Sequence, residues 1–176
     1  MKTLIVYYSH TGNNKKLAYL LCKKLNCDIH KITEAKKRRM ISIPLDLIFK
    51  RKTKLSAYIL PFKEYERIIF IGPIWGNHIS TPMKAFIERE KHHIGKYGYV
   101  TICNGQKGQK EKIISELTAL IQHSPIDVME LPINSLLPER RKNKRKITFR
   151  FFISKQNLKC FETEVDHFLG SMFKKQ

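Results

Sequence analysis

The stretch LIVYYSHTGNNKKLAYLL, residues 4–21, decides the fold expected for this chain. It opens with an unbroken apolar run from Leu4 to Tyr8, which is typical of a strand. The run stops at the polar segment Ser9 to Asn14, and an apolar face at helical spacing follows. That face consists of Leu17, Leu20, Leu21 and Leu25. This order predicts a strand, a tight turn and a helix.

The turn between this strand and helix has the composition of an anion-binding site. Ser9, Thr11, Asn13 and Asn14 supply hydroxyl and amide groups around a single glycine, Gly12. The first N–H groups of the following helix have no acceptor within the helix, so they can bind the same anion. The turn therefore predicts a phosphate site. The alternative is an ordinary strand-to-helix turn without a ligand.

Three common motifs do not fit residues 9–14. A P-loop ends a longer glycine-rich turn with Gly-Lys-Ser or Gly-Lys-Thr, and a dinucleotide fingerprint has three spaced glycines. A hydrolase elbow places a serine between glycines. The turn has one glycine and none of these patterns. A phosphate bound here must be held by another kind of loop.

A second informative stretch, residues 72–87, follows another expected strand. Arg67 to Gly72 contains four consecutive apolar residues, as in a strand covered on both faces, and we expect it at the centre of the sheet. The only tryptophan, Trp75, lies next to Gly76, and a helix is expected to open near Pro82. A flat ring beside a glycine offers a planar ligand a stacking face and close backbone approach. The alternative is a core tryptophan in a surface turn.

A third strand end is expected after Tyr97 to Cys103. The loop Asn104-Gly105-Gln106-Lys107-Gly108 follows, and then a helix. The apolar face of that helix is Ile113, Ile114, Leu117, Leu120 and Ile121. No histidine lies beside Cys103 in the sequence, so we expect strand-end packing rather than a nucleophilic role for its thiol.

The first two loops carry a family resemblance. The pattern Ser9-x-Thr11-Gly12-Asn13-x after the first strand resembles the FMN phosphate loop of the flavodoxin family, usually Ser/Thr-x-Thr-Gly-x-Thr. Asn14 stands in place of the last threonine. Residues 72–87 resemble the second flavin loop of that family, in which Pro-Val-Trp-Ala-Gly precedes Pro-Pro-Val-Arg-x-Phe. Here Gly76-Asn77 replaces Ala-Gly.

The resemblance implies a flavodoxin-like protein with FMN as its cofactor. Its phosphate would lie on the first loop, Trp75 would stack on the isoalloxazine, and the other loops would shape the ring edge. The candidate cofactor-binding residues are Ser9, His10, Thr11, Gly12, Asn13, Asn14, Pro73, Ile74, Trp75, Gly76, Asn77, Cys103, Asn104, Gly105 and Gly108. No catalytic acid or base and no metal are expected. His10 and His78 are expected to hydrogen-bond within their turns.

The other expected elements complete an α/β fold. They are an edge strand at Asp28 to Thr33, a crossover helix at Ile43 to Lys50, a fifth strand at Asp127 to Ile133 and a final helix from Leu158 to Phe173. Strand–helix repeats with right-handed crossovers predict an open parallel five-stranded sheet with helices on both faces. The resemblance supplies the flavodoxin-like order 2-1-3-4-5. The segment Ile147 to Ile153 fits an extra strand, a continuation of the fifth strand, or a partner-docking patch.

Composition indicates one domain, residues 1–176, with a strongly basic surface. The 34 basic and 15 acidic residues give a net charge of +19, with dense patches at Lys36–Arg39, Lys50–Lys54 and Arg140–Lys146. Such a charge favours acidic partners. Nucleic acid, an anionic membrane surface, an acidic redox protein and a phosphorylated nicotinamide cofactor all fit. The alternative is a set of charges that only solvates the surface.

The sequence favours a cytoplasmic location. No membrane span and no secretory signal are expected, because the apolar runs are too short or too polar. The four cysteines lack CxxC spacing and a histidine cluster, so we expect reduced, mostly buried thiols. They are Cys22, Cys27, Cys103 and Cys160.

Two functional hypotheses follow from these patterns. The first is an FMN-dependent electron-transfer protein, either a carrier or a small reductase, with an acidic redox protein, NADH or NADPH as partner. The second is a basic module with the same fold but no flavin, which binds nucleic acid or an anionic membrane. Nucleic acid is disfavoured because the chain lacks its usual motifs. Peripheral membrane contact stays open, and the oligomeric state is not indicated.

Overall fold

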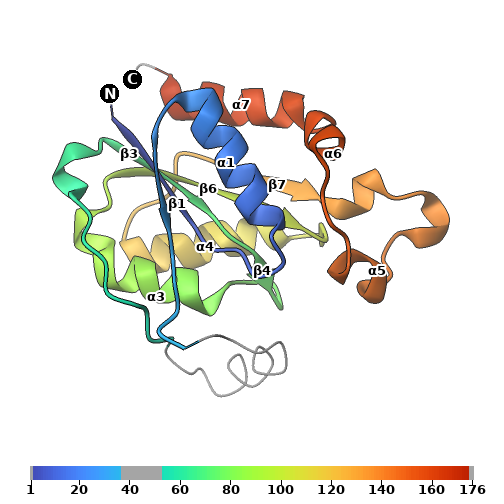
Figure 1. Cartoon of the computed structure of the whole chain (residues 1–176), viewed down its shortest axis with the longest axis horizontal. Coiled ribbons are helices and arrows are strands. Elements are labelled where there is room, and N and C mark those ends of the chain that lie inside the picture. The colour runs from blue at the N-terminus through green and yellow to red at the C-terminus, as the bar shows by residue number, and fades with distance from the viewer. Residues whose placement is uncertain (1, 37–52, 175–176) are drawn as a thin grey trace.

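The computed structural model describes residues 2–36 and 53–174, and its centre is one parallel sheet (Figure 1). The strand order is β2-β1-β3-β6-β7, and every neighbouring pair is parallel. The strands are β1 (Thr3–Tyr7), β2 (Asp28–Lys31), β3 (Arg67–Ile71), β6 (Lys96–Cys103) and β7 (Val128–Pro132). The predicted order is confirmed, with β2 at an edge and β3 at the centre.

Helices cover both faces of the sheet, as predicted (Figure 1). One pair packs on each face, so the architecture has three layers. The pair on one face is α1 (Asn13–Leu25) and α7 (Glu162–Phe173), and the pair on the other is α3 (Thr81–Glu90) and α4 (Gln109–Ile121).

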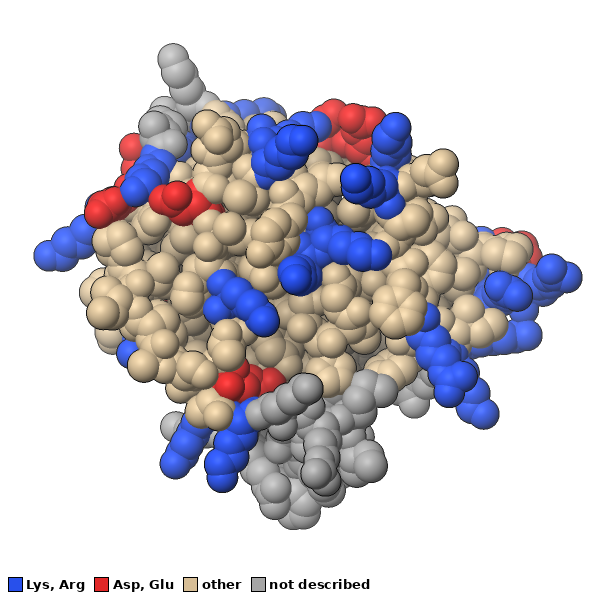
Figure 2. Space-filling model, viewed as in Figure 1, with Lys and Arg blue, Asp and Glu red and all other residues tan. Residues whose placement is uncertain are grey.

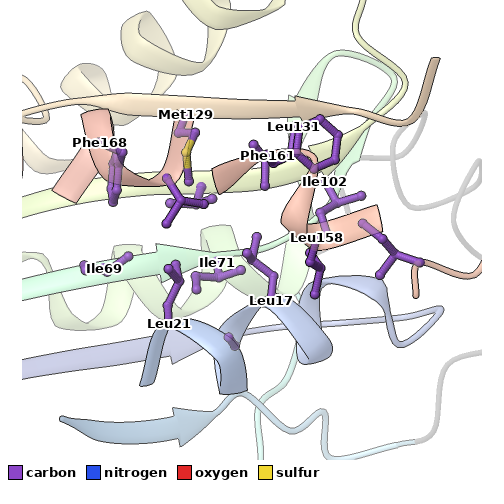
Figure 3. Packing of buried hydrophobic residues seen from close by; sticks show 14 of the residues in the cluster. Leu17, Leu21, Ile69, Ile71, Ile102, Met129, Leu131, Leu158, Phe161 and Phe168 are labelled. Carbon is purple, nitrogen blue, oxygen red and sulfur yellow. The ribbon is translucent and has the colours of Figure 1, made fainter. Parts of the chain in front are cut away.

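Two apolar cores result from this arrangement, one on each face. Successive side chains of a strand point to opposite faces. Under α1 and α7, Leu17 and Leu21 share a buried cluster with Ile69 and Ile71 of β3 and Phe168 of α7 (Figure 3). The other face holds an equivalent cluster under α3 and α4. A strand between two cores must be apolar on both sides, which explains the unbroken apolar runs in the sequence.

Gly98 of β6 allows α7 to lie close to the sheet. A Cβ atom at this position would be 2.6 Å from the Met172 Sδ and 2.8 Å from the Phe168 Cζ. In a close-packed core, such contacts would force the helix side chains to move. The glycine therefore helps to set the spacing between α7 and the sheet.

Shorter elements connect these layers. A hairpin after β3 consists of β4 (Ile74–Trp75) and β5 (His78–Ile79). Two short helices, α5 (Arg145–Phe149) and α6 (Lys155–Lys159), precede α7. The 3-10 turns are η1 (Phe62–Glu64), η2 (Lys91–His93), η3 (Ile133–Leu136) and η4 (Glu139–Arg141).

The predicted final helix is divided in the structure. α6 ends at Lys159 and α7 begins at Glu162, because the backbone of Phe161 (φ −106°, ψ 17°) is not helical. Both Leu158 and Phe161 are buried. The break lets residues on each side of it face the same core.

The interpretation of Ile147 to Ile153 as a strand is wrong. Residues up to Phe149 belong to α5, and residues 150–154 form neither helix nor strand. The backbone of this segment hydrogen-bonds to the Asn13 side chain instead of a neighbouring strand. The predicted crossover helix at residues 43–50 lies outside the described residues.

Candidate functional site

Three loops converge at the carboxyl ends of the strands. They follow β1, β3 and β6, which are adjacent and parallel, so their carboxyl ends lie side by side. β2 lies on one side of β1, while β3 lies on the other. Ligands of open α/β sheets bind at such a point, where the strand order reverses. The topology thus brings the three predicted site loops to one place.

The loop after β1 is a candidate anion cradle. Gly12 has a φ of 93°, in the left-handed region that favours glycine, and precedes the first residue of α1. Its N–H donates to the Ser9 Oγ at 3.1 Å. A Cβ at residue 12 would meet no heavy atom within 4 Å, so there is open space beside the turn. The N-terminal N–H groups of α1 begin at this space.

Asn13 and Asn14 use their side-chain oxygens within the protein. The Asn13 Nδ2 donates to the Phe151 carbonyl at 2.7 Å, and its Oδ1 accepts the Ile153 N–H at 3.0 Å. The Asn14 Oδ1 accepts the Ile102 N–H at 3.0 Å, and both asparagines are buried. Phosphate contact by these two residues stays a prediction, for which their backbone N–H groups are the better donors.

The loop after β3 is a hairpin with a two-residue turn. Trp75 pairs with His78, and the turn residues between them are Gly76 (φ 56°) and Asn77 (φ 66°). Positive φ at both positions is the geometry of a type I′ turn. Asparagine tolerates this conformation better than most residues. The replacement of Ala-Gly by Gly76-Asn77 therefore suits a tight hairpin that presents Trp75.

Trp75 lies against the first loop. Its half-buried ring makes edge-to-face contacts with Tyr8, at 5.9 Å between ring centroids, and with His10, at 6.3 Å. Tyr8 is held in turn by its hydroxyl, which donates to the Glu34 Oε1 at 2.7 Å. The tryptophan therefore lies beside the candidate anion cradle.

Glu116 of α4 anchors the hairpin from the other side. Its Oε2 accepts the Ile79 N–H at 2.9 Å, and its Oε1 lies 2.5 Å from the Lys84 Nζ. At the base of the hairpin, the Pro73 carbonyl accepts the Ser80 N–H at 3.2 Å. A hairpin fixed at these points holds Trp75 in a defined position.

The loop after β6 depends on two glycines. Gly105 and Gly108 both have a φ of 73°. A Cβ on Gly105 would lie 2.5 Å from the Pro132 Cβ, so any larger residue would be strained there. The Asn104 carbonyl accepts a hydrogen bond from the Asn134 Nδ2 at 2.7 Å. This loop is thus fastened to the segment that follows β7.

Cys103 is a packed thiol at the end of β6. Burial, with a contribution from Glu130, raises its pKa to about 12, so the thiol stays protonated near neutral pH. The expectation of mostly buried cysteines is wrong, because Cys22 and Cys27 are half-buried and Cys160 is exposed. Cys22 and Cys27 lie near the end of α1, at the margin of the core under α1 and α7, which covers them only in part. Cys160 lies in the break before α7 and is exposed.

Two residues of the site were missed by sequence reasoning. Glu116 looks like any polar residue of α4, and it lies 37 positions from the amide that it binds. Tyr8 carried a signal, since an aromatic residue ends the apolar run directly beside the polar turn. Only the structure shows that its ring meets Trp75.

Within residues 2–36 and 53–174, no group of three or more histidine, cysteine, aspartate or glutamate side chains is placed to hold a metal ion. No helix in the same ranges has the length and apolar character needed to cross a bilayer.

Comparison with solved structures defines the class of fold. No protein-family model and no curated protein matches the sequence. The flavoprotein of Lactobacillus acidophilus NCFM, in complex with FMN, is similar with a TM-score of 0.64, 20% identity, and coverage of 73% of this chain and 92% of that chain. The apo form of the flavoprotein from the same organism has a TM-score of 0.58, 21% identity, and coverage of 73% and 91%.

A similarity also extends over the full length of the chain. The NAD(P)H:quinone oxidoreductase from Methanothermobacter marburgensis has a TM-score of 0.53 and 11% identity, and 100% of this chain and 99% of that chain are covered. At such identities the likeness is one of fold. Together with the strand order, it shows that the chain has the flavodoxin-like fold.

Proposed function

We propose that this protein binds FMN at the carboxyl ends of its β-strands and works in electron transfer. The contact of Trp75 with Tyr8 and His10 carries the proposal, because it joins a flat aromatic ring to the anion cradle at Gly12. FMN combines a planar ring with a terminal phosphate, which matches this pair of features. The similar fold of a flavoprotein in complex with FMN supports the assignment.

The residues present fit each part of FMN. The open space beside Gly12, the hydroxyl groups of Ser9 and Thr11 and the N-terminal N–H groups of α1 suit the phosphate. The half-buried Trp75 suits the isoalloxazine. The left-handed turns at Gly76-Asn77 and at Gly105 would place backbone groups near the ring edge, where hydrogen bonds would tune the potential of the flavin.

FMN supplies the electron-transfer chemistry when it is bound. The chain's own residues bind it, orient it and exclude water from one face of its ring. No acid or base is needed from the three loops. Cys103, with its raised pKa, is unsuited to act as a nucleophile there.

The protein is either a reductase or an electron carrier, and the two differ in the electron donor. The full-length fold similarity to an NAD(P)H:quinone oxidoreductase supports a reductase that uses NADH or NADPH. The net charge of +19 suits a carrier that meets an acidic redox protein, and it also suits the phosphates of NADPH. Either form fits the cytoplasm, where nicotinamide cofactors are abundant.

Visible absorbance of the purified protein tests the proposal. We expect a flavin spectrum, and bleaching of that spectrum without oxygen when NADH or NADPH is added would identify the reductase form. The variant Thr11→Leu should lose FMN, because a bulky apolar side chain would enter the cradle. Thr163→Leu, an exposed position on α7, is the matched control and should keep it. Equal FMN affinity in both variants would refute the site, and a colourless protein that ignores FMN would favour a basic module without flavin.

A further inference from the structure

A compact basic lobe projects from the end of the sheet between β7 and α6 (Figure 1). We define this basic lobe as residues 139–152, which include η4 and α5. Seven of its residues are basic and one, Glu139, is acidic. Glu139 is itself paired with Lys142. The lobe therefore carries a charge of one sign over a short length of chain.

Five of the cations of the basic lobe face water. Exposed basic side chains are Arg140, Arg141, Lys144, Lys146 and Arg150. Figure 2 shows lysine and arginine side chains projecting from this end of the molecule. Because these charges lie close together, they produce a field that attracts an anionic surface more strongly than scattered charges would.

Two phenylalanines lie among these cations and are left in water. Phe149 is 50% exposed and Phe152 is 70% exposed. The neighbouring apolar residues behave differently, since Ile153 is buried and Phe151 packs on the core under α1 and α7. The inward residues secure the lobe, so packing does not account for the outward pair. Single exposed apolar residues are common, but a pair within a cluster of cations is not explained by chance exposure alone.

The basic lobe is fixed to the body of the protein. Asn13 binds the backbone of Phe151 and Ile153, and the Lys16 Nζ donates to the Ile153 carbonyl at 2.7 Å. All three bonds end on the first turns of α1. A surface that binds the lobe therefore also holds the loop after β1 near it.

We propose that the basic lobe docks this protein on a membrane surface rich in anionic phospholipid. Basic side chains attract acidic headgroups, and the exposed phenylalanine rings enter the boundary between headgroups and acyl chains. This inference goes beyond electron transfer and does not depend on FMN. The docking is peripheral.

Two other anionic partners fit the observations less well. An acidic protein would need about 20–30 residues on each side of a stable interface, whereas the basic lobe has 14 residues, 139–152. Single-stranded nucleic acid binds in a charged groove that follows its backbone, and the basic lobe is a projection. A small projecting lobe that exposes both cations and two apolar rings suits a lipid surface.

Co-sedimentation with lipid vesicles tests the proposal on the full chain. We expect binding to vesicles of phosphatidylglycerol and phosphatidylcholine, no binding to pure phosphatidylcholine, and weaker binding as salt rises. Phe149→Ala with Phe152→Ala should reduce the bound fraction at fixed lipid on the order of tenfold or more. Lys144→Glu with Lys146→Glu should do the same.

Matched controls keep the test specific to the basic lobe. Lys91→Glu with Lys112→Glu changes the net charge equally at exposed positions elsewhere, and Ile59→Ala removes an apolar side chain that is 97% exposed. Both should bind vesicles as the unaltered protein does, and circular dichroism should show that every variant is folded. Equal losses in lobe and control variants, or no vesicle binding, would overturn the proposal. Binding that is insensitive to the phenylalanine changes and is removed by single-stranded nucleic acid would also overturn it.

Discussion

Asn14 lies in the first turn of α1, but its side chain serves β6. The Asn14 Oδ1 accepts the Ile102 N–H at 3.0 Å in a buried position. Loss of this acceptor would leave a buried N–H without a partner, which costs about 1–3 kcal/mol. Asn14→Ala should lower the free energy of unfolding by that amount, measured by urea denaturation. The exposed neighbour Lys15 is the control, and Lys15→Ala should change stability little. An Asn14→Ala variant as stable as the unaltered protein would contradict this role.

His30 gives a second prediction at the residue scale. Its ring, on β2, packs against Tyr58 at 5.1 Å and Phe86 at 5.9 Å between centroids, and burial lowers its pKa below 6.5. Because the unfolded chain then takes up the proton more readily, stability should be full above pH 6.5. It should fall as pH decreases from 6.5 to the lowered folded-state pKa.

Two variants separate this effect from general acid sensitivity. His30→Gln should flatten the pH dependence of the free energy of unfolding below pH 6.5, while His92→Gln, at an exposed position in η2, should leave it unchanged. Urea denaturation at several pH values measures both. The same slope in the His30 variant and the unaltered protein would show that His30 is not the group responsible.

Single residues also show what the sequence could predict about the site. Gly12 and Trp75 are recognisable because a glycine in a polar turn and a lone tryptophan after a strand are local patterns. The bond from Asn14 to Ile102 joins residues 88 positions apart, so no local pattern contains it. The sequence predicted that the Asn14 side chain contacts a phosphate. It could not show that the Ile102 N–H of the folded chain already binds the oxygen of this side chain.

At the scale of elements, the hairpin of β4 and β5 depends on a helix next to it. Glu116 of α4 accepts the Ile79 N–H, and hydrogen bonds to charged groups contribute about 1.5–3 kcal/mol. Glu116→Ala should release the hairpin, lower the fluorescence anisotropy of Trp75 and weaken FMN binding on the order of tenfold. Glu116→Gln keeps an oxygen acceptor and should largely restore both. Unchanged anisotropy and affinity in the alanine variant would refute the anchoring role.

Elements differ in how well the sequence predicts them. The central strands follow from apolar runs, and α1 and α4 follow from leucine and isoleucine at helical spacing. The two-residue strands of the hairpin are too short to produce any period. Apolar spacing also continues across the break at Phe161, so periodicity alone predicted one helix where the backbone forms two.

The whole molecule carries a net charge of +19, which should affect the redox behaviour of a bound flavin. Reduction adds negative charge to the flavin, and a positive field stabilises that charge and raises the reduction potential. Salt screens such a field over about 10 Å at 0.1 M, so the potential should fall as ionic strength rises. A redox titration at low and high salt measures this effect. A potential that is insensitive to salt would contradict it.

Position should matter as well as net charge. Lys15 lies in the first turn of α1, at the carboxyl ends of the strands, where the FMN site is proposed. Lys91 lies in η2, which precedes the start of β6, so it is at the amino ends of the strands. Lys15→Gln should therefore lower the potential more than Lys91→Gln, although both remove one positive charge. Equal shifts would indicate that only the net charge matters.

The central claim is that the turn at Gly12 and the ring of Trp75 form one FMN site. Because Trp75 is the only tryptophan, its fluorescence reports on that site alone. The most direct measurement is a titration of the flavin-free protein with FMN, followed by tryptophan emission. We expect saturable quenching at one FMN per chain, which Thr11→Leu abolishes. Emission that stays constant as FMN is added, or quenching that is the same in Thr11→Leu, would contradict the claim.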